Sequence, residues 1–200
     1  PVSARDIRRI VAHAGNLQIT DRVNIVLRVL GSAAACGVRR ALLMPDKGGI
    51  RALLERHFKH HRDEASAYPA IEFLDFEPTS TVEDSFRATR RLIDAGVSAI
   101  VVLGGDGTHR AVVRELRLAG STIPVAGLST GTNNAFPEMR EPTITGMAVG
   151  LWASGRVARD EALAPNKLVE VHIADPVRGD RRDVAIVDAV VTHDRSVGAR

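Results

Sequence analysis

A glycine-rich segment in the middle of the chain has the residue types of a phosphate-binding loop. Its members, in order, are Gly104, Gly105, Asp106, Gly107 and Thr108. Three glycines in four positions leave backbone N–H groups that an anion can approach without a Cβ in the way. Apolar residues at helical spacing follow and indicate a helix, whose first turn adds the positive end of its dipole. These features together favour a polyphosphate ligand.

Asp106 is the unexpected member of this segment, because bound phosphates repel a neighbouring carboxylate. Its presence is explained if it holds Mg²⁺ against the phosphates or takes a proton from an attacking hydroxyl group. The structural alternative is an ordinary glycine-rich turn in which Asp106 or Thr108 caps the next helix. The residues of this segment alone leave both interpretations open.

A second polar segment follows the next apolar run. It consists of Ser129, Thr130, Gly131, Thr132, Asn133, Asn134, Ala135, Phe136 and Pro137. Its hydroxyl and amide groups are neutral donors and acceptors suited to phosphate, ribose or an adenine edge, although a polar loop before a helix is the plainer interpretation. Ligands of open parallel sheets bind beyond the carboxyl ends of the strands, so the two segments predict one joint site. Neither a Walker-type loop nor a Gly-x-Gly-x-x-Gly fingerprint is present, which argues against P-loop enzymes and ordinary dinucleotide oxidoreductases.

The apolar pattern predicts alternating strands and helices that would position both segments. Short apolar runs at 41–44, 71–74, 99–103 and 123–128 begin about 27 residues apart, the length of one βα unit. The intervening segments have apolar residues at helical spacing; Gly37 is expected to end the first helix, and a capping box at Ser80 to open the third. We therefore expect an α/β domain over residues 1–155, with a doubly wound, Rossmann-like parallel sheet.

The pattern changes after Gly155. Residues 168–173 alternate in polarity, residues 175–180 are turn formers, and residues 184–191 form a second apolar strand with no helix before it. This hairpin predicts the start of an antiparallel β-rich second domain over residues 166–200. Two strands cannot bury a core, so we expect further chain or a partner to complete this domain. Its free edges also offer a surface for homo-oligomer formation.

Residues 104–108 resemble the signature shared by NAD kinases, diacylglycerol kinases and sphingosine kinases. Residues 129–137 are most similar to the NAD-kinase-related proteins encoded with acetoin-catabolism genes, and so are residues 6–9, 44–46 and 194–200. The similarity runs along essentially the whole chain. The chain therefore resembles the ATP-NAD kinase family.

This resemblance implies a two-domain kinase whose active site lies between the α/β domain and the β-rich domain. Asp106 would be the base or the carboxylate that supports the metal. The backbone amides of Gly105, Gly107 and Thr108 would hold the donor phosphates, with Gly104 in the same loop. The nucleotide pocket would be lined by Ser129, Thr130, Gly131, Thr132, Asn133 and Asn134. The substrates implied are ATP, or polyphosphate in some relatives, and NAD as acceptor at its ribose 2′-hydroxyl, with Mg²⁺ assisting.

Two alternatives remain beside an NAD kinase. A lipid or polyol kinase of the same superfamily would use the same loops, and a regulatory protein linked to acetoin catabolism would bind nucleotide without turnover. The family pattern also includes a first strand that ends in Asn-Pro and a later segment that grips the acceptor nucleotide. Neither is found in residues 1–200, so the sequence is expected to be a fragment.

Composition excludes several classes of protein. A hydrophobic fraction of 44% argues against disorder, and the single cysteine, Cys36, argues against a disulfide scaffold. No apolar run approaches the ~18 residues of a membrane span, and a cytoplasmic protein is expected. Arginine supplies 24 of the 27 basic residues; guanidinium groups suit a phosphate partner, but the codon usage of a GC-rich genome is the favoured explanation. Interspersed acidic residues and an aromatic fraction of 4% argue against nucleic acid as a partner.

Histidines and paired glycines give three further expectations. The histidines at 57, 60 and 61 have metal-ligand spacing on one helix, but their charged neighbours favour a solvated face, so we assign no metal ligands. His109 directly follows the glycine-rich segment and either contacts a phosphate or only sits in the first helical turn. Gly146 and Gly150 lie four residues apart, which predicts close packing of their helix against another.

Overall fold

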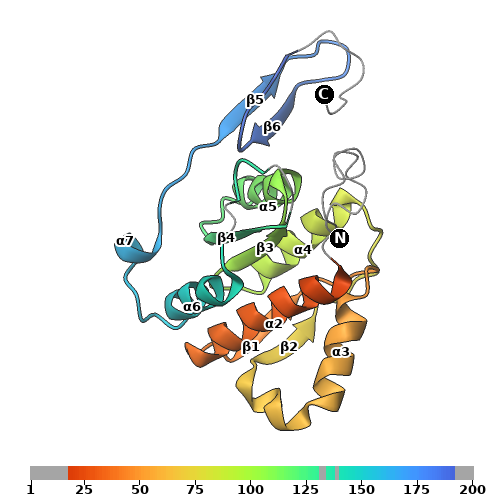
Figure 1. Ribbon diagram of the computed structural model, residues 1–200. Coiled ribbons are helices and arrows are strands. Elements are labelled where there is room, and N and C mark those ends of the chain that lie inside the picture. Colours follow the sequence, from red (N-terminus) through yellow and green to blue (C-terminus); the bar gives the residue numbers. More distant parts are fainter. Residues whose placement is uncertain (1–17, 131–133, 138–139, 192–200) are drawn as a thin grey trace.

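The computed structural model describes residues 18–130, 134–137 and 140–191 (Figure 1). Its helices are α2 (Ile19–Ala35), α3 (Ile50–His60), the short 3₁₀ helix η1 (Arg62–Ala67), α4 (Val82–Asp94), α5 (Asp106–Leu118), α6 (Pro142–Ala153) and α7 (Arg159–Ala162). Its strands are β1 (Arg40–Leu43), β2 (Ala70–Phe73), β3 (Ile100–Gly104), β4 (Val125–Ser129), β5 (Val169–Ile173) and β6 (Arg181–Ala185). In this part of the chain, none of the helices has both the length and the apolar character that a membrane crossing requires.

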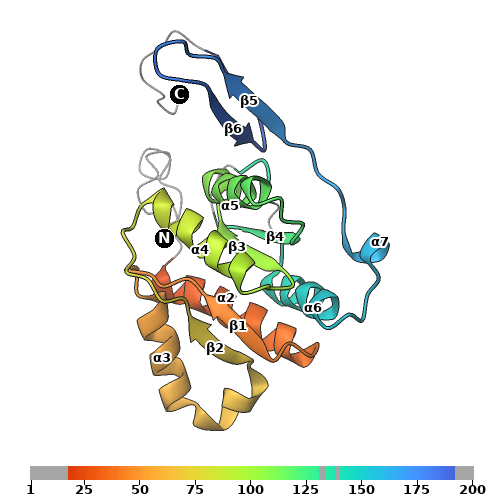
Figure 2. The ribbon, with the colours of Figure 1, turned by 180° about the vertical axis from the view of Figure 1, so that it is seen from behind.

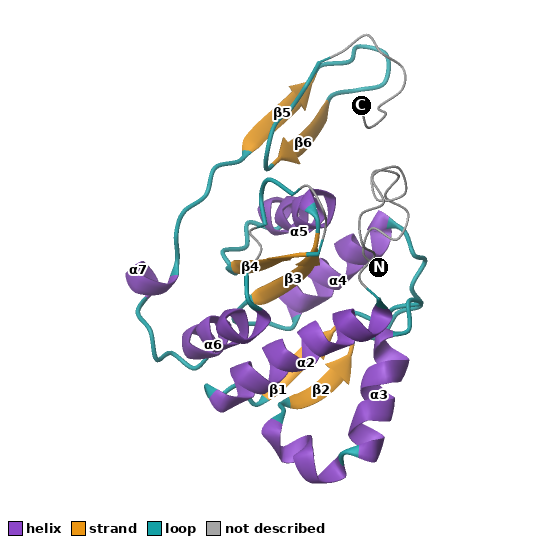
Figure 3. Cartoon of the chain, viewed as in Figure 1, coloured by secondary structure: helices purple, strands orange, loops and turns teal. Residues whose placement is uncertain are grey.

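Two pairs of parallel strands form the α/β part of the molecule (Figure 3). β1 pairs with β2, with Arg40 opposite Ala70, and β3 pairs with β4, with Ile100 opposite Val125. A helical crossover joins the strands of each pair, and the mixed α/β class is confirmed. Among the described residues the two pairs are separate sheets, so the single doubly wound sheet stays a prediction.

β3 carries side chains into both apolar clusters of the α/β part. Ile100 and Val102 are buried with Val112 and Leu116 of α5. Leu103, between them and the loop, packs instead against the cluster that α2 and α3 form around Leu54. Because successive side chains of a strand point to opposite faces, β3 connects the two clusters. The first glycine-rich loop therefore follows the strand that is packed on both sides.

Helix α6 lies directly against α2, as its glycines predicted (Figure 1). A Cβ built on Gly146 would lie 2.9 Å from Val29 Cα, and one built on Gly150 would lie 2.6 Å from Cys36 Cβ. At the far end of α6, the indole Nε1 of Trp152 donates a hydrogen bond of 2.8 Å to the backbone of the segment before β3. The small residues thus let the two helix backbones approach closely.

The start of α4 differs from the predicted capping box. Thr81, not Ser80, is the N-cap, and its Oγ1 accepts a hydrogen bond from Glu83 N at 3.3 Å. Asp84 turns back and accepts hydrogen bonds from Thr79 N and Ser80 N. Burial alone would raise the pKa of Asp84, but these hydrogen bonds outweigh burial and hold it below the ordinary value. The capping residues are therefore shifted by one position from the expected box, with Thr81 in place of Ser80 and Asp84 in place of Glu83.

The hairpin after α7 is antiparallel, with Val169 of β5 opposite Ala185 of β6 (Figure 2). The strand predicted over residues 184–191 was wrong, since β6 begins at Arg181 and ends at Ala185. The polar start of β6 pairs with β5, and Asp183 contacts arginines of α5, whereas Val190 and Val191 are exposed. Polarity alone could not indicate these contacts. The extent of a second domain over residues 166–200 stays a prediction.

Candidate functional site

The two polar segments begin side by side at one edge of the β3–β4 pair. Gly104 at the end of β3 lies opposite Ser129 at the end of β4. Thr130 N then donates a hydrogen bond of 3.4 Å to the Gly104 carbonyl, one residue beyond the ladder. Parallel strands place their carboxyl ends together, so this arrangement follows from the predicted topology. Gly131, Thr132 and Asn133 lie outside the described residues, as do residues 6–9 and 194–200.

Asp106 ties the second segment to the first. Its carboxylate accepts hydrogen bonds from Ala135 N at 3.0 Å and from Phe136 N at 2.9 Å. Asp106 is also the first residue of α5, where a carboxylate is favoured by the positive end of the helix dipole. The sequence left open that Asp106 caps the helix that follows it. In the structure Asp106 does accept hydrogen bonds from backbone amides, but these amides belong to the second loop and not to α5.

The three glycines of the first segment have different surroundings. A Cβ on Gly104 would lie 2.7 Å from Thr108 Cβ, and one on Gly105 would lie 2.7 Å from Asn134 Oδ1. A Cβ on Gly107 would meet nothing within 4 Å. Gly104 is therefore required by the nearby Thr108 Cβ, whereas a side chain at Gly105 would force the end of the Asn134 side chain to shift. Only Gly107 leaves its backbone open to a ligand in the way that the sequence suggested for all three.

The carbonyl of Gly105 accepts the first backbone hydrogen bonds of α5. Thr108 N and His109 N both donate to it, each at 3.1 Å. The expected phosphate contact of Thr108 N therefore competes with a bond inside the helix. The N–H groups of Asp106 and Gly107 occupy the first two helical positions, where an α-helix offers no internal acceptor.

A side-chain hydrogen bond joins Ser129 and Asn134 across the second segment. Asn134 Nδ2 donates to Ser129 Oγ at 2.7 Å, while its Oδ1 lies over the Cα of Gly105. This side chain thus fixes the distance between the loops. The geometry brings Ser129 and Asn134 next to Gly105 and Asp106, as expected for one joint site.

His109 is fully buried beneath both loops. Its Nδ1 lies 2.9 Å from the Gly105 carbonyl oxygen, and its ring centroid lies 5.7 Å from that of Phe136. Burial lowers the pKa of His109, although the Gly105 carbonyl and the Asp106 carboxylate favour the charged ring. The side chain does not reach the open face of the loop, so of the two interpretations the buried position in the first turn is correct. The sequence pattern gave no sign of its neighbour Gly127, where a Cβ would lie 2.7 Å from His109 Nε2.

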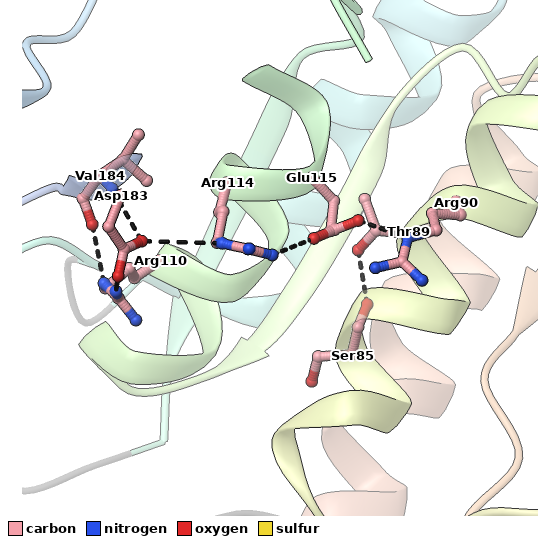
Figure 4. Close-up of polar contacts among 8 residues, drawn as sticks. All are labelled: Ser85, Thr89, Arg90, Arg110, Arg114, Glu115, Asp183 and Val184. Atoms are coloured by element: carbon pink, nitrogen blue, oxygen red, sulfur yellow. Dashed lines mark hydrogen bonds and ion pairs between the residues drawn. The ribbon is translucent and has the colours of Figure 1, made fainter. Parts of the chain in front are cut away.

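A chain of charges connects the helix of the site to the hairpin (Figure 4). Asp183 of β6 pairs with Arg110 and, at 3.7 Å, with Arg114 of α5. Arg114 also contacts Glu115 at 2.5 Å, and the buried Glu115 contacts Arg90 of α4 at 2.5 Å. The hairpin is therefore held by ion pairs to the helix that begins at Asp106.

One helical turn after Arg114, Arg117 of α5 also contacts the hairpin. Its guanidinium donates to Glu170 of β5 at 2.6 Å and 2.8 Å. The Arg117 hydrogen bonds, followed by the attraction of its charge, lower the pKa of Glu170. Both strands of the hairpin thus contact α5 through acidic side chains.

Comparison with known proteins shows the family of the chain. Residues 9–156 match the model of the ATP-NAD kinase N-terminal domain, which is more than half of the chain. The chain belongs to the ATP-NAD kinase family. "Acetoin catabolism protein X" of Cupriavidus necator is 56% identical over 200 residues, which cover 100% of this chain and 55% of that protein. The chain thus spans about half the length of this curated relative. No solved structure matches the chain significantly.

Proposed function

We propose that the chain is the nucleotide-binding part of a kinase that transfers a phosphoryl group from ATP to the ribose 2′-hydroxyl of NAD. Family membership supports kinase chemistry with nucleotide substrates. The observation that carries the proposal is the bridge from Asp106 to Ala135 N and Phe136 N. It joins a glycine-rich helix start and a polar loop into one site at the carboxyl ends of adjacent strands, where such folds bind ligands.

The first loop holds the donor phosphates in this proposal. The N–H groups at the start of α5, which have no acceptor inside the helix, and the open backbone of Gly107 supply donors, and the helix dipole supplies positive potential. Gly104, Gly105 and Thr108 shape this loop. The second loop binds the nucleoside through Ser129, Thr130, Gly131, Thr132, Asn133 and Asn134.

Asp106 is the catalytic residue of the proposed reaction. A carboxylate oxygen has about two acceptor positions, and Oδ2 accepts only the Ala135 N–H among the described groups. Its second position accepts the proton of the acceptor hydroxyl while the hydroxyl oxygen forms its bond to the γ-phosphorus and ADP leaves. Phosphoryl transfer depends mainly on positioning and charge stabilisation, which suits a site with one carboxylate and many amides.

Mg²⁺ fits this donor set only as an ion that arrives with the nucleotide. Within the described residues no group of three or more His, Cys, Asp or Glu side chains could hold a metal ion alone. Mg²⁺ is commonly held by one or two carboxylates together with phosphate oxygens and waters. Asp106 would be the protein ligand in place of its role as base, because its open acceptor position serves either the ion or the proton, and the ion would neutralise charge on the transferred group.

We infer that the β1–β2 and β3–β4 pairs are parts of one doubly wound sheet in the domain over residues 1–155, with residues 166–200 starting a β-rich domain. Leu103 of β3 packs into the cluster around Leu54 together with Leu43 of β1, which supports a shared core.

One observation favours a second function, a nucleotide-binding regulator without turnover. The Asp106 carboxylate holds the second loop, which is a structural task that needs no catalysis. The relative's name would connect such a regulator to acetoin catabolism.

A phosphoryl-transfer assay on the full-length protein distinguishes the two. Labelled ATP and Mg²⁺ are offered with NAD and with a panel of diols and lipids, and ATP binding is measured separately. Asp106→Asn is compared with Asp94→Asn, an exposed carboxylate at the end of α4. We expect labelled NADP from the wild type and Asp94→Asn, and none from Asp106→Asn. ATP binding without transfer to any acceptor would refute the kinase and support the regulator.

A further inference from the structure

His109 is completely buried and contacts a backbone carbonyl of the first loop. It is 0% exposed, Nδ1 contacts the Gly105 carbonyl at 2.9 Å, and among the described residues no group lies at hydrogen-bond distance from Nε2, although the Val102 carbonyl also faces the ring. A buried polar atom without a partner costs about 1–3 kcal/mol, so an aliphatic side chain here would be cheaper for packing alone. The hydrogen bond at Nδ1 is the feature that an aliphatic side chain could not supply.

The Gly105 carbonyl fixes the protonation of the ring. A carbonyl oxygen only accepts, so Nδ1 must carry the hydrogen of this bond. Burial favours the neutral ring, which leaves Nε2 without a proton. The charged and carbonyl groups that face the ring are Asp106 and the backbone oxygens of Gly105 and Val102. Gly127 and Phe136, which pack against it from β4 and the second loop, carry no charge.

The same peptide group that His109 holds also carries the N–H of Asp106. The carbonyl of Gly105 and the N–H of Asp106 belong to one trans peptide plane and point in opposite directions. Because Thr108 N, His109 N and His109 Nδ1 all hold the carbonyl toward the helix, the Asp106 N–H must point out of it. A flipped peptide would instead present the negative carbonyl to the ligand.

We propose that His109 is a positioning residue that locks the Gly105–Asp106 peptide so that the Asp106 N–H faces the bound phosphates. This role rests on the proposed function of the loop. Helix hydrogen bonds alone hold the carbonyl from one side, and the imidazole holds it from the interior, where no water competes. Gly127 supplies the space for the ring, because a Cβ there would lie 2.7 Å from Nε2.

Two amide substitutions test the position of the donor. In His109→Asn the side-chain NH₂ takes the place of Nδ1, whereas in His109→Gln it takes the place of Nε2. Both remove the ring and bury one amide, so a loss of packing affects both. Binding of ATP and of inorganic triphosphate to the full-length protein is measured by calorimetry, with circular dichroism as the check on folding. We expect His109→Asn to bind within about threefold of the wild type and His109→Gln about tenfold more weakly, the loss of one hydrogen bond.

A spectroscopic measurement on the ligand-free protein complements the affinities. Nitrogen-15 NMR of labelled histidine is expected to show His109 neutral and protonated at Nδ1 at pH 7. A proton on Nε2 instead, or equal triphosphate affinity of the Asn and Gln variants, would overturn the proposal. If the wild type binds neither ATP nor triphosphate, the proposed function fails first, and the positioning role fails with it.

Discussion

Replacing Gly146 by alanine should destabilise the protein, although alanine is the better helix former. Inside a helix, the change from glycine to alanine gains about 0.5–1 kcal/mol of stability from backbone entropy. At Gly146 the new Cβ would lie 2.9 Å from Val29 Cα and even closer to Ser32 Oγ and the Val29 carbonyl. Backbone atoms cannot rotate away, so α6 must move off α2.

The expected magnitude follows from these two opposing effects. Overpacking costs about 1–3 kcal/mol, so the net loss in the free energy of unfolding should be about 1–2 kcal/mol. Gly31→Ala is the matched control, because Gly31 lies inside α2 and its nearest neighbour to a new Cβ is Tyr68 Cε1 at 3.4 Å. Ordinary contact there leaves the helix gain intact, and Gly31→Ala should stabilise by about 0.5–1 kcal/mol.

Urea unfolding measures both variants, with two signals. Circular dichroism follows the helices, and the fluorescence of Trp152, the single tryptophan of the chain, follows the end of α6. The two variants should move the unfolding midpoint in opposite directions. Equal stabilisation by Gly146→Ala and Gly31→Ala would refute the close contact between α2 and α6.

Two further predictions concern charged groups. Asp84→Asn should remove a part of the stability that depends on pH. The pKa of Asp84 in the folded state lies below the ordinary 3.8. Its contribution to stability is therefore present above that pH and is lost as the pH falls through the folded-state pKa. Urea unfolding from pH 7 to pH 2 should give a shallower decline for Asp84→Asn, and an unchanged slope would contradict the assignment. Asp183→Asn should loosen the hairpin, since half-exposed ion pairs contribute about 0.2–1 kcal/mol each. Hydrogen exchange over residues 169–185 should rise relative to Asp188→Asn, and wild-type exchange should rise at high salt; no change in either would refute ionic docking.

The helices could be predicted because their apolar faces and their ends are local features. The apolar spacing at Val23, Val26 and Leu30 corresponds to the buried face of α2. Gly37, with φ +104°, follows the Cys36 C-cap, as expected for a left-handed residue after a helix. The four parallel strands were predicted within about two residues for the same reason, since apolar runs of four to six residues suit buried parallel strands.

The first strand of the hairpin was predicted within one residue, but the second strand could not be placed from its own residues. Val187, Val190 and Val191 are the more apolar choice for a strand, but they are exposed in the structure. β6 lies instead where Asp183 meets two arginines of α5, more than 65 residues earlier in the chain. Such a contact depends on tertiary placement, which no local pattern encodes.

The candidate site also has features that the sequence predicts and features that it does not. The meeting of its two loops was predictable, because parallel strands end at one edge. The roles of individual glycines could not be predicted. Gly105 leaves space for the Asn134 side chain, and Gly127 leaves space for the His109 ring. Each of these pairs joins residues from different elements, and only the folded structure shows which neighbour needs the space.

These contacts form a closed circuit around the site. His109 holds the Gly105 carbonyl, Asp106 holds the backbone of Ala135 and Phe136, and the Phe136 ring lies against His109. Residues in one circuit of contacts do not act independently, so a substitution in either loop changes the geometry of both. Asp106 therefore cannot be removed without disturbing the loop that it holds. His109→Asn and His109→Gln keep Asp106 intact, and for this reason they separate the orientation of the phosphate donors from the chemistry of the carboxylate.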